Sequence, residues 1–376
     1  MSISVDCAFR WPAWASHRFN AAAQNGTDKH IVNAQDRDTT SGGALGAGYR
    51  APEEERIGEV RREEEYQALM QRLSHQSVVK HFDAYADIEW NSPEFRIDRD
   101  DPRWQLDTDD VLGATEWYQA QPASIRSRIG LHMQANFFKL GVAFESVLKR
   151  GLLEFATKLP NHSAEFRYCY HEVIEEAQHS LMFQEFVNRS GFEIPGLNRV
   201  ERTGANMVVR MARNFPELFF VFVLAGEDPI DHAQRQTLHR NRADIHPLLR
   251  RIMQIHVTEE ARHLSFARHY LRRHVPMLGA ARRTQLMVRV PLILGGMGRM
   301  MMEASPAIMR EYEIPKEVSQ QAYKLNPVHR ERTLGATKKL RELCTELRLI
   351  NQWSWRLWRM QGIWPASATL LAATDR

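Results

Sequence analysis

Apolar side chains recur every three or four residues over most of this chain, which is the period of amphipathic helices. Alternating valine-rich runs with hairpin turns, the usual marks of β-strands, are nearly absent. The pattern predicts helices at residues 63–82, 124–158, 163–190, 202–238, 243–274, 280–304, 328–347 and 352–360. Four of these helices are long and follow one another, so we expect an all-α protein built on a four-helix bundle with additional helices.

Prolines interrupt two of the predicted helices. Pro216 and Pro229 lie inside 202–238, and Pro291 lies inside 280–304. Proline lacks a backbone donor and clashes with the preceding turn, so each one predicts a break, a kink or a local widening of the helix.

The N-terminal segment differs from the rest of the chain. Residues 25–52 are rich in Gly, Ala, Asn, Asp and Thr and show no apolar period. This composition is typical of a mobile arm or linker. We therefore predict a mobile N-terminal arm at 1–55 and one helical domain at 56–376, although a start codon placed too far upstream would produce the same pattern.

Charge and cysteine content exclude several classes of protein. The 50 Lys and Arg exceed the 46 Asp and Glu by only four, and they are scattered, so nucleic-acid binding is not expected. The cysteines Cys7, Cys169 and Cys344 lie far apart, which excludes a disulfide scaffold and fits a reducing cytoplasm. The sequence has neither an apolar run of membrane-spanning length nor a signal-peptide core, so we expect a cytoplasmic protein without a membrane span.

Two of the long helices share a sequence repeat. Residues 171–179 read HEVIEEAQH and residues 256–263 read HVTEEARH. When Glu176 is placed over Glu260, a valine, two glutamates, an alanine and a histidine coincide. A glutamate and a histidine three residues apart point to the same side of a helix, so each helix presents a Glu-x-x-His pair.

The preceding helices each carry a glutamate within an apolar run. Glu145 lies 31 residues before Glu176, and Glu227 lies 33 residues before Glu260. At about 1.5 Å per helical residue, each spacing lets the chain turn and return level on an antiparallel neighbour. An unpaired carboxylate in such surroundings is costly, and a bound metal removes that cost.

One glutamate from each of two helices and a Glu-x-x-His from each of two others form the ferritin-like dinuclear carboxylate pattern. The predicted ligands are Glu145, Glu176, His179, Glu227, Glu260 and His263. Two divalent irons would balance the four carboxylates, and manganese is the main alternative. Glu175 and Glu259 lie four residues from the histidines and are the alternative ligands. The i, i+3 motif favours Glu176 and Glu260, so Glu175 and Glu259 are expected around the ligands or at the surface. The competing interpretation is a bundle whose repeated segments are solvated faces without metal.

His256 breaks the symmetry of the repeat. It lies four residues before Glu260 and seven before His263, so the three side chains fall within about 60° of helix azimuth. We interpret His256 as a seventh ligand; the alternative is a core histidine bonded to a carboxylate near the metals. In the first copy of the repeat, Glu172 occupies the position that corresponds to His256. His171 lies one position away from this side of the helix and is expected near the ligands or at the surface.

The order Glu145, Glu176-x-x-His179, Glu227, His256-x3-Glu260-x-x-His263 resembles the AurF-type diiron N-oxygenases, which include p-aminobenzoate N-oxygenase and the chloramphenicol arylamine oxygenase. The resemblance covers roughly residues 115–305. It implies that two non-haem irons activate O2 and oxidise an amine nitrogen of a small metabolite to a hydroxylamine, nitroso or nitro product. It also implies a homodimer. Because the chain has no GxGxxG fingerprint, the electrons are expected from an external donor.

Three other functions stay open at this point: diiron C-hydroxylation or desaturation, a ferritin-like ferroxidase, and a helical bundle without catalysis. The substrate cannot be derived from the sequence. If it carries a carboxylate, Arg299 is the candidate to bind it, against the simpler interpretation of a solvated arginine. The tryptophans of 352–364 favour packing across the bundle or a dimer contact over a membrane-surface helix.

Overall fold

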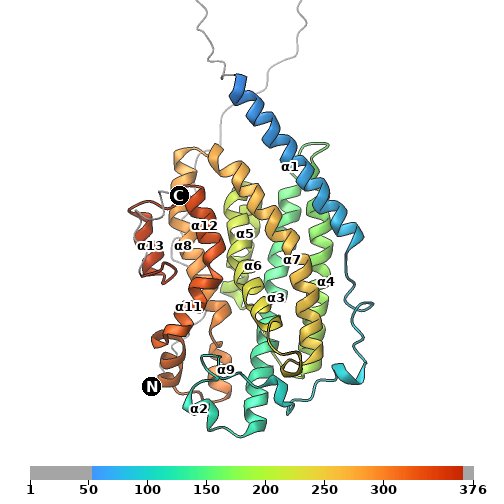
Figure 1. Cartoon of the computed structure of the whole chain (residues 1–376), viewed down its shortest axis with the longest axis vertical. Helices are drawn as coiled ribbons and strands as arrows, with labels where there is room; N and C mark the ends of the chain where they lie inside the picture. The colour runs from blue at the N-terminus through green and yellow to red at the C-terminus, as the bar shows by residue number, and fades with distance from the viewer. Residues whose placement is uncertain (1–52, 367–376) are drawn as a thin grey trace, which may run out of the picture.

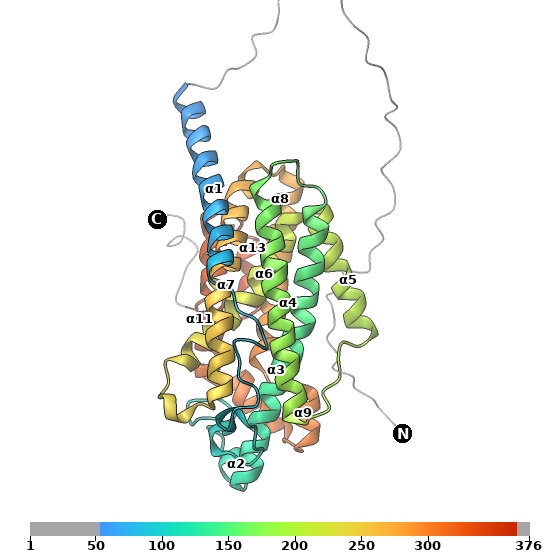
Figure 2. The same ribbon diagram turned by 90° about the vertical axis from the view of Figure 1, so that its right-hand side faces the viewer.

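The computed structural model describes residues 53–366, and within them the chain is helical without a strand (Figures 1 and 2). This confirms the predicted all-α class. The mobile arm predicted at 1–55 lies almost entirely outside the described residues. The α-helices are α1 (Glu53–Val79), α2 (Glu116–Gln119), α3 (Ala123–Ala156), α4 (Ala164–Ser190), α5 (Arg199–Asn214), α6 (Pro216–Leu238), α7 (Pro247–His274), α8 (Ala280–Met302), α9 (Pro306–Glu311), α10 (Lys316–Ser319), α11 (Pro327–Ala336), α12 (Lys338–Glu346) and α13 (Ser354–Met360).

Helices α3, α4, α6 and α7 form the four-helix bundle. α3 packs along α4, α6 packs along α7, and contacts of α3 with α6 and of α4 with α7 close the bundle. Proline and glycine residues explain where two of these helices begin or end. Pro247 occupies the first turn of α7, where no backbone donor is needed, and Gly191 ends α4 in the left-handed conformation with φ of 67°.

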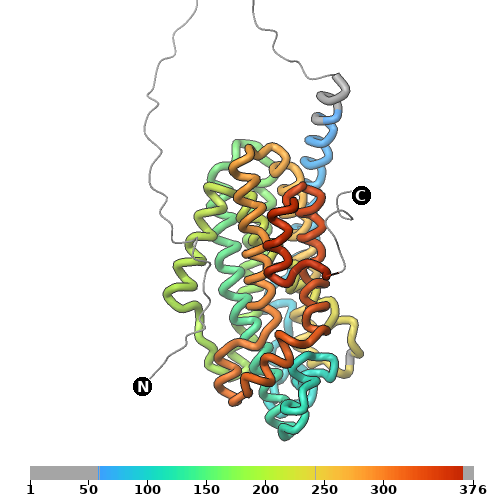
Figure 3. The backbone as a smooth tube through the Cα atoms, turned by 90° about the vertical axis from the view of Figure 1, so that its left-hand side faces the viewer, coloured from blue at the N-terminus to red at the C-terminus, as the bar shows by residue number. Residues whose placement is uncertain are grey.

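The remaining long helices cover the outside of the bundle. α1 lies against α4 and α7, and α5 lies against α3 and α6. α8 and the C-terminal helices cover α6 on the other side (Figure 3). Trp358 of α13 is fully buried in the main core cluster together with Leu294 and Met297 of α8. Trp358 therefore packs onto the body of the protein, and a dimer contact through this segment stays a prediction.

The three prolines predicted to interrupt helices have different effects on the backbone. The chain breaks at Pro216, which separates α5 from α6, whereas Pro229 and Pro291 lie inside continuous helices. The helix predicted at 328–347 is also divided, into α11 and α12. Pro216 occupies the first turn of α6, where a helix needs no backbone donor, so it begins this helix without the loss of a hydrogen bond.

Two glycines allow α6 to approach α3 closely. A side-chain carbon at Gly226 would overlap the ring of Phe144, and one at Gly151 would overlap the ring of Phe219. Since Glu227 directly follows Gly226 and Glu145 directly follows Phe144, this close packing brings the two glutamates toward the same level of the bundle.

None of the helices between residues 53 and 366 has both the length and the apolar character that a membrane span requires.

Candidate metal centre

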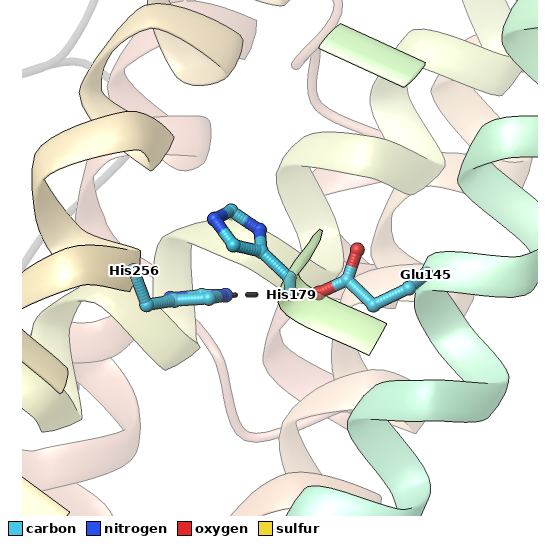
Figure 4. A group of neighbouring side chains, drawn as sticks. All are labelled: Glu145, His179 and His256. Atoms are coloured by element: carbon cyan, nitrogen blue, oxygen red, sulfur yellow. Dashed lines mark ion pairs between the residues drawn. The ribbon is translucent and has the colours of Figure 1, made fainter. Parts of the chain in front are cut away.

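The seven residues predicted as ligands gather in the middle of the bundle. Each of them is at most 1% exposed. They come from all four bundle helices: Glu145 from α3, the Glu176–His179 pair from α4, Glu227 from α6, and His256, Glu260 and His263 from α7. Figure 4 shows the side chains of Glu145, His179 and His256 directed toward one another.

Donor atoms of these residues lie close enough together to hold metal ions. Four groups have one potential donor atom per residue, all within 4.8 Å of one another. Three of the groups consist of predicted ligands alone, and the fourth includes Glu172. The groups are Glu145–His179–His256, Glu227–His256–Glu260, Glu176–His179–Glu260 and Glu172–Glu176–His263.

Glu176 and Glu260 lie between the two histidines of the repeat. The Nδ1 atom of His263 is 3.1 Å from Glu176 Oε1 and 3.0 Å from Glu260 Oε1. The Nδ1 atom of His179 is 3.4 Å from Glu176 Oε2 and 3.5 Å from Glu260 Oε1. Carboxylates that face both histidines are suited to bridge two metal ions.

The other glutamate of each pair orients the histidine of the opposite helix. His179 Nε2 lies 2.9 Å from Glu259 Oε2, and His263 Nε2 lies 2.8 Å from Glu175 Oε2. A hydrogen bond at Nε2 leaves Nδ1 free to bind a metal, which is how proteins usually hold ligating imidazoles. The sequence left Glu175 and Glu259 either near the ligands or at the surface; the structure buries both of them.

Arg262 joins these two orienting glutamates. Its Nη2 atom is 2.7 Å from Glu175 Oε1 and 3.5 Å from Glu259 Oε1. Glu259 Oε1 also accepts a hydrogen bond from the backbone amide of Phe82, 3.1 Å away, in the segment after α1. The buried guanidinium of Arg262 thus balances the negative charge of Glu175 and Glu259, whose carboxylates would not bind the metals.

His256 is also held by a hydrogen bond at one ring nitrogen, but the roles of its two nitrogens are the reverse of those in His179 and His263. Its Nδ1 atom is 2.9 Å from the side-chain oxygen of Gln234, which can accept an Nδ1 hydrogen. Its Nε2 atom then faces Glu145 Oε1 at 3.6 Å and Glu260 Oε1 at 3.7 Å. The hydrogen-bond partner of His256 is thus an amide, and its role as a seventh ligand stays a prediction.

Unpartnered polar atoms are concentrated at this centre. Both carboxylate oxygens of Glu176 and of Glu227 are buried without a hydrogen bond, as are one oxygen of Glu145 and one of Glu260. The same holds for His179 Nδ1 and His256 Nε2. Leaving so many buried polar atoms unsatisfied is costly in a protein core. Hard carboxylate oxygens and imidazole nitrogens aimed at one another fit a pair of iron or manganese ions.

Protonation in this cluster follows from burial and mutual charge. Burial and the carboxylates of Glu260 and Glu176 raise the pKa of Glu227 well above its usual range. Although burial opposes it, the negative charges of Glu176 and Glu259, together with the hydrogen bond to Glu259, raise the pKa of His179 to about 9. Burial lowers the pKa of His256 to about 4, so its imidazole is neutral near pH 7, the form that binds a metal.

Two predicted positions lie away from the cluster. Arg299 is exposed on α8, where it donates a hydrogen bond to the side chain of Gln361 over 3.2 Å. Its assignment to a substrate carboxylate stays a prediction. His171 is partly exposed, and its Nε2 atom lies 3.4 Å from Nε of Arg167 on the same helix.

Three residues of the centre were not identified from the sequence: Glu172, Gln234 and Arg262. Glu172 and Gln234 are each 1% exposed, and Arg262 is 5% exposed. A helical spacing would have indicated Gln234, which lies seven residues after Glu227 and therefore on the same side of α6. Arg262 directly precedes His263, and nothing in its spacing distinguishes it from a surface arginine.

Comparison with known proteins adds a family and three relatives. The family model described as "P-aminobenzoate N-oxygenase AurF" matches residues 63–348. Proteins of Mycobacterium bovis and of two Mycobacterium tuberculosis strains are 40% identical over 296 residues, which covers 79% of this chain and 87% of each relative. All three carry the name "uncharacterized protein". No solved structure matches the chain.

Proposed function

Because the chain belongs to the p-aminobenzoate N-oxygenase AurF family, we propose that it is a diiron oxygenase that uses O2 to oxidise an amine nitrogen of a small molecule. The observation that carries this proposal is the convergence of unpartnered donor atoms from four helices on one buried point. The finer assignments, which are the identity of the metal, the use of O2 and the attack on nitrogen, rest on the family together with this geometry.

The proposed ligands divide between two irons according to the repeat. Glu145 and His179 would hold one iron, and Glu227 and His263 would hold the other. His256 lies in one group of donors with Glu145 and His179 and in another with Glu227 and Glu260. Glu176 and Glu260 would bridge the two irons, because each faces both histidines of the repeat. Bound iron would supply the electrons and the Lewis acidity for the reduction of O2.

The protein itself supplies orientation and a dry environment. Glu259 and Glu175 hold the imidazoles of His179 and His263 through their Nε2 atoms. The ring of Phe183 packs 5.1 Å from that of His256, and the ring of Phe144 packs 5.2 Å from that of Phe222. These aromatic contacts exclude water from the ligand atoms, which strengthens their electrostatic interactions.

An external electron donor is part of this proposal. Conversion of an amine to a hydroxylamine inserts one oxygen atom and releases the other as water, which takes two electrons and two protons in addition to O2. The described part of the chain has no disulfide, and the sequence has no dinucleotide fingerprint. A reduced iron–sulfur protein or a small-molecule reductant would fill this role in the cytoplasm.

A single-turnover reaction tests the proposed chemistry. The full-length protein is loaded with iron, reduced and mixed with 18O2 and each of a panel of arylamines. We expect a hydroxylamine, nitroso or nitro product that carries 18O, detected by mass spectrometry, and no such product from a Glu227→Ala variant. Oxygen found on carbon would favour a hydroxylase. Growth of an iron mineral without any organic product would favour a ferroxidase. Either result would contradict N-oxygenation.

We also propose that the protein forms a homodimer through α4. The apolar side chains Phe166, Tyr170, Ile174 and Leu181 follow helical spacing along this helix and are 44–58% exposed. A continuous apolar stripe of this kind is typical of a protein–protein contact. We expect light scattering after gel filtration to give a dimer for the parent and a monomer for Ile174→Glu.

The matched control for the dimer is Val60→Glu on α1, where the parent side chain is 59% exposed, and this variant should stay a dimer. A monomeric parent, or a dimeric Ile174→Glu variant, would contradict a dimer interface at this stripe.

A further inference from the structure

We propose that Glu172 is an eighth metal-binding residue, whose carboxylate binds the iron held by Glu176 and His263. This inference rests on the proposed diiron centre and adds a residue to it. Glu172 lies on α4 and is 1% exposed, and its Oε2 atom is buried without a hydrogen bond. One of its carboxylate oxygens belongs to the group with Glu176 and His263 in which all donor atoms lie within 4.8 Å of one another.

The internal repeat gives an independent reason for this assignment. Placing Glu176 over Glu260 also places Glu172 over His256, because each precedes its glutamate by four residues. His256 extends from α7 toward donors on α3 and α4, namely Glu145 and His179 (Figure 4). Glu172 extends from α4 toward His263 on α7. The two residues therefore occupy the same position of the repeat, one on each of its two helices, and each extends toward a histidine on the opposite helix.

The kinds of donor differ between the groups. The group of donors around Glu145 contains two imidazoles, from His179 and His256. The group around His263 contains one imidazole, and Glu172 adds a carboxylate to it. With Glu172 as a ligand, one metal position is richer in nitrogen and the other is richer in oxygen.

Such an asymmetry has a chemical consequence. Hard oxygen ligands carrying negative charge favour the ferric state more than imidazole does. The two irons would then differ in their tendency to give up an electron to O2.

The test compares variants of the full-length protein loaded with 57Fe. Glu172→Gln keeps the size of the side chain and removes its charge. We expect it to weaken binding of the second iron at least about 10-fold, as measured by equilibrium iron titration, since even groups that only orient a ligand contribute that much. We also expect the Mössbauer signal of one iron to change while that of the other is kept.

Glu165→Gln is the matched control. Glu165 lies seven residues earlier on α4, is also buried, and accepts a hydrogen bond from Ser163 at 2.6 Å instead of facing the cluster. This variant should bind iron as the parent does. Parent-like iron affinity and an unchanged spectrum in Glu172→Gln would overturn the proposal.

A crystal structure of the iron-loaded parent covers the case in which Glu172→Gln does not fold. A Glu172 oxygen within bonding distance of one iron would support the proposal, and a Glu172 side chain bonded only to protein atoms would overturn it. A parent that binds no iron would contradict the proposed function itself, which distinguishes that failure from the failure of this inference.

Discussion

Alanine in place of Glu176 or Glu260 is expected to lower the iron content of the purified protein from two ions per chain to one or none. Both carboxylates are fully buried and face the Nδ1 atoms of His179 and His263 at 3.0–3.5 Å. Each would bridge the two irons, so its loss removes a donor from both at once. Iron is counted by inductively coupled plasma mass spectrometry after anaerobic loading and desalting.

Glu175→Gln and Glu259→Gln are the matched comparison, because these neighbours contact the histidines through the opposite nitrogen. They should keep iron, with an affinity reduced by about 10–100-fold, the usual effect of removing a group that orients a ligand. Full iron content in both alanine variants would contradict the ligand assignment. Loss of iron from the two glutamine variants alone would show that the other glutamate of each pair binds the metal.

Methionine in place of Arg262 is expected to lower the free energy of unfolding of the iron-free protein by about 3–5 kcal/mol. Arg262 is the cation that Glu175 and Glu259 share inside the bundle, at 2.7 Å and 3.5 Å. Methionine matches much of the length of arginine but leaves both carboxylates without this partner. Thermal unfolding followed by circular dichroism would show the loss as a large decrease in Tm.

Arg272→Met on the same helix is the control for this prediction. Arg272 pairs with Glu346 at 2.8 Å, but the two side chains are 42% and 50% exposed. Exposed pairs of this kind contribute about 0–1 kcal/mol, so Tm should change little. An equal decrease in Tm for both variants would show that the burial of Arg262 has no special role.

The sequence was sufficient to predict the long helices and the ligand cluster because both depend on local spacing. The apolar period predicted the bundle helices, and the i, i+3 spacing of Glu176 with His179 and of Glu260 with His263 placed each pair on one side of a helix. The 31- and 33-residue spacings placed Glu145 and Glu227 level with them. Whether these residues bind metal stays a proposal, although the structure brings all of them together.

The contacts between helices were not predictable in this way. Glu175 orients His263, and Glu259 orients His179, and both contacts cross from one helix to the other. They depend on the height and rotation of α4 relative to α7, which a single sequence does not contain. The position of Arg262 depends on the same register. The effects of proline also depended on context, since Pro216 begins a helix whereas Pro229 and Pro291 lie within one.

The iron content and Mössbauer spectrum of the 57Fe-loaded full-length protein would show whether the bundle holds a diiron centre. We expect two irons per chain, present as a spin-coupled pair once oxidised in air, because two bridging carboxylates would hold them close together. We also expect Tm to increase on loading, since the metal binds only the folded centre. One isolated iron per chain, or a folded protein that takes up none under anaerobic loading, would contradict the proposed diiron centre.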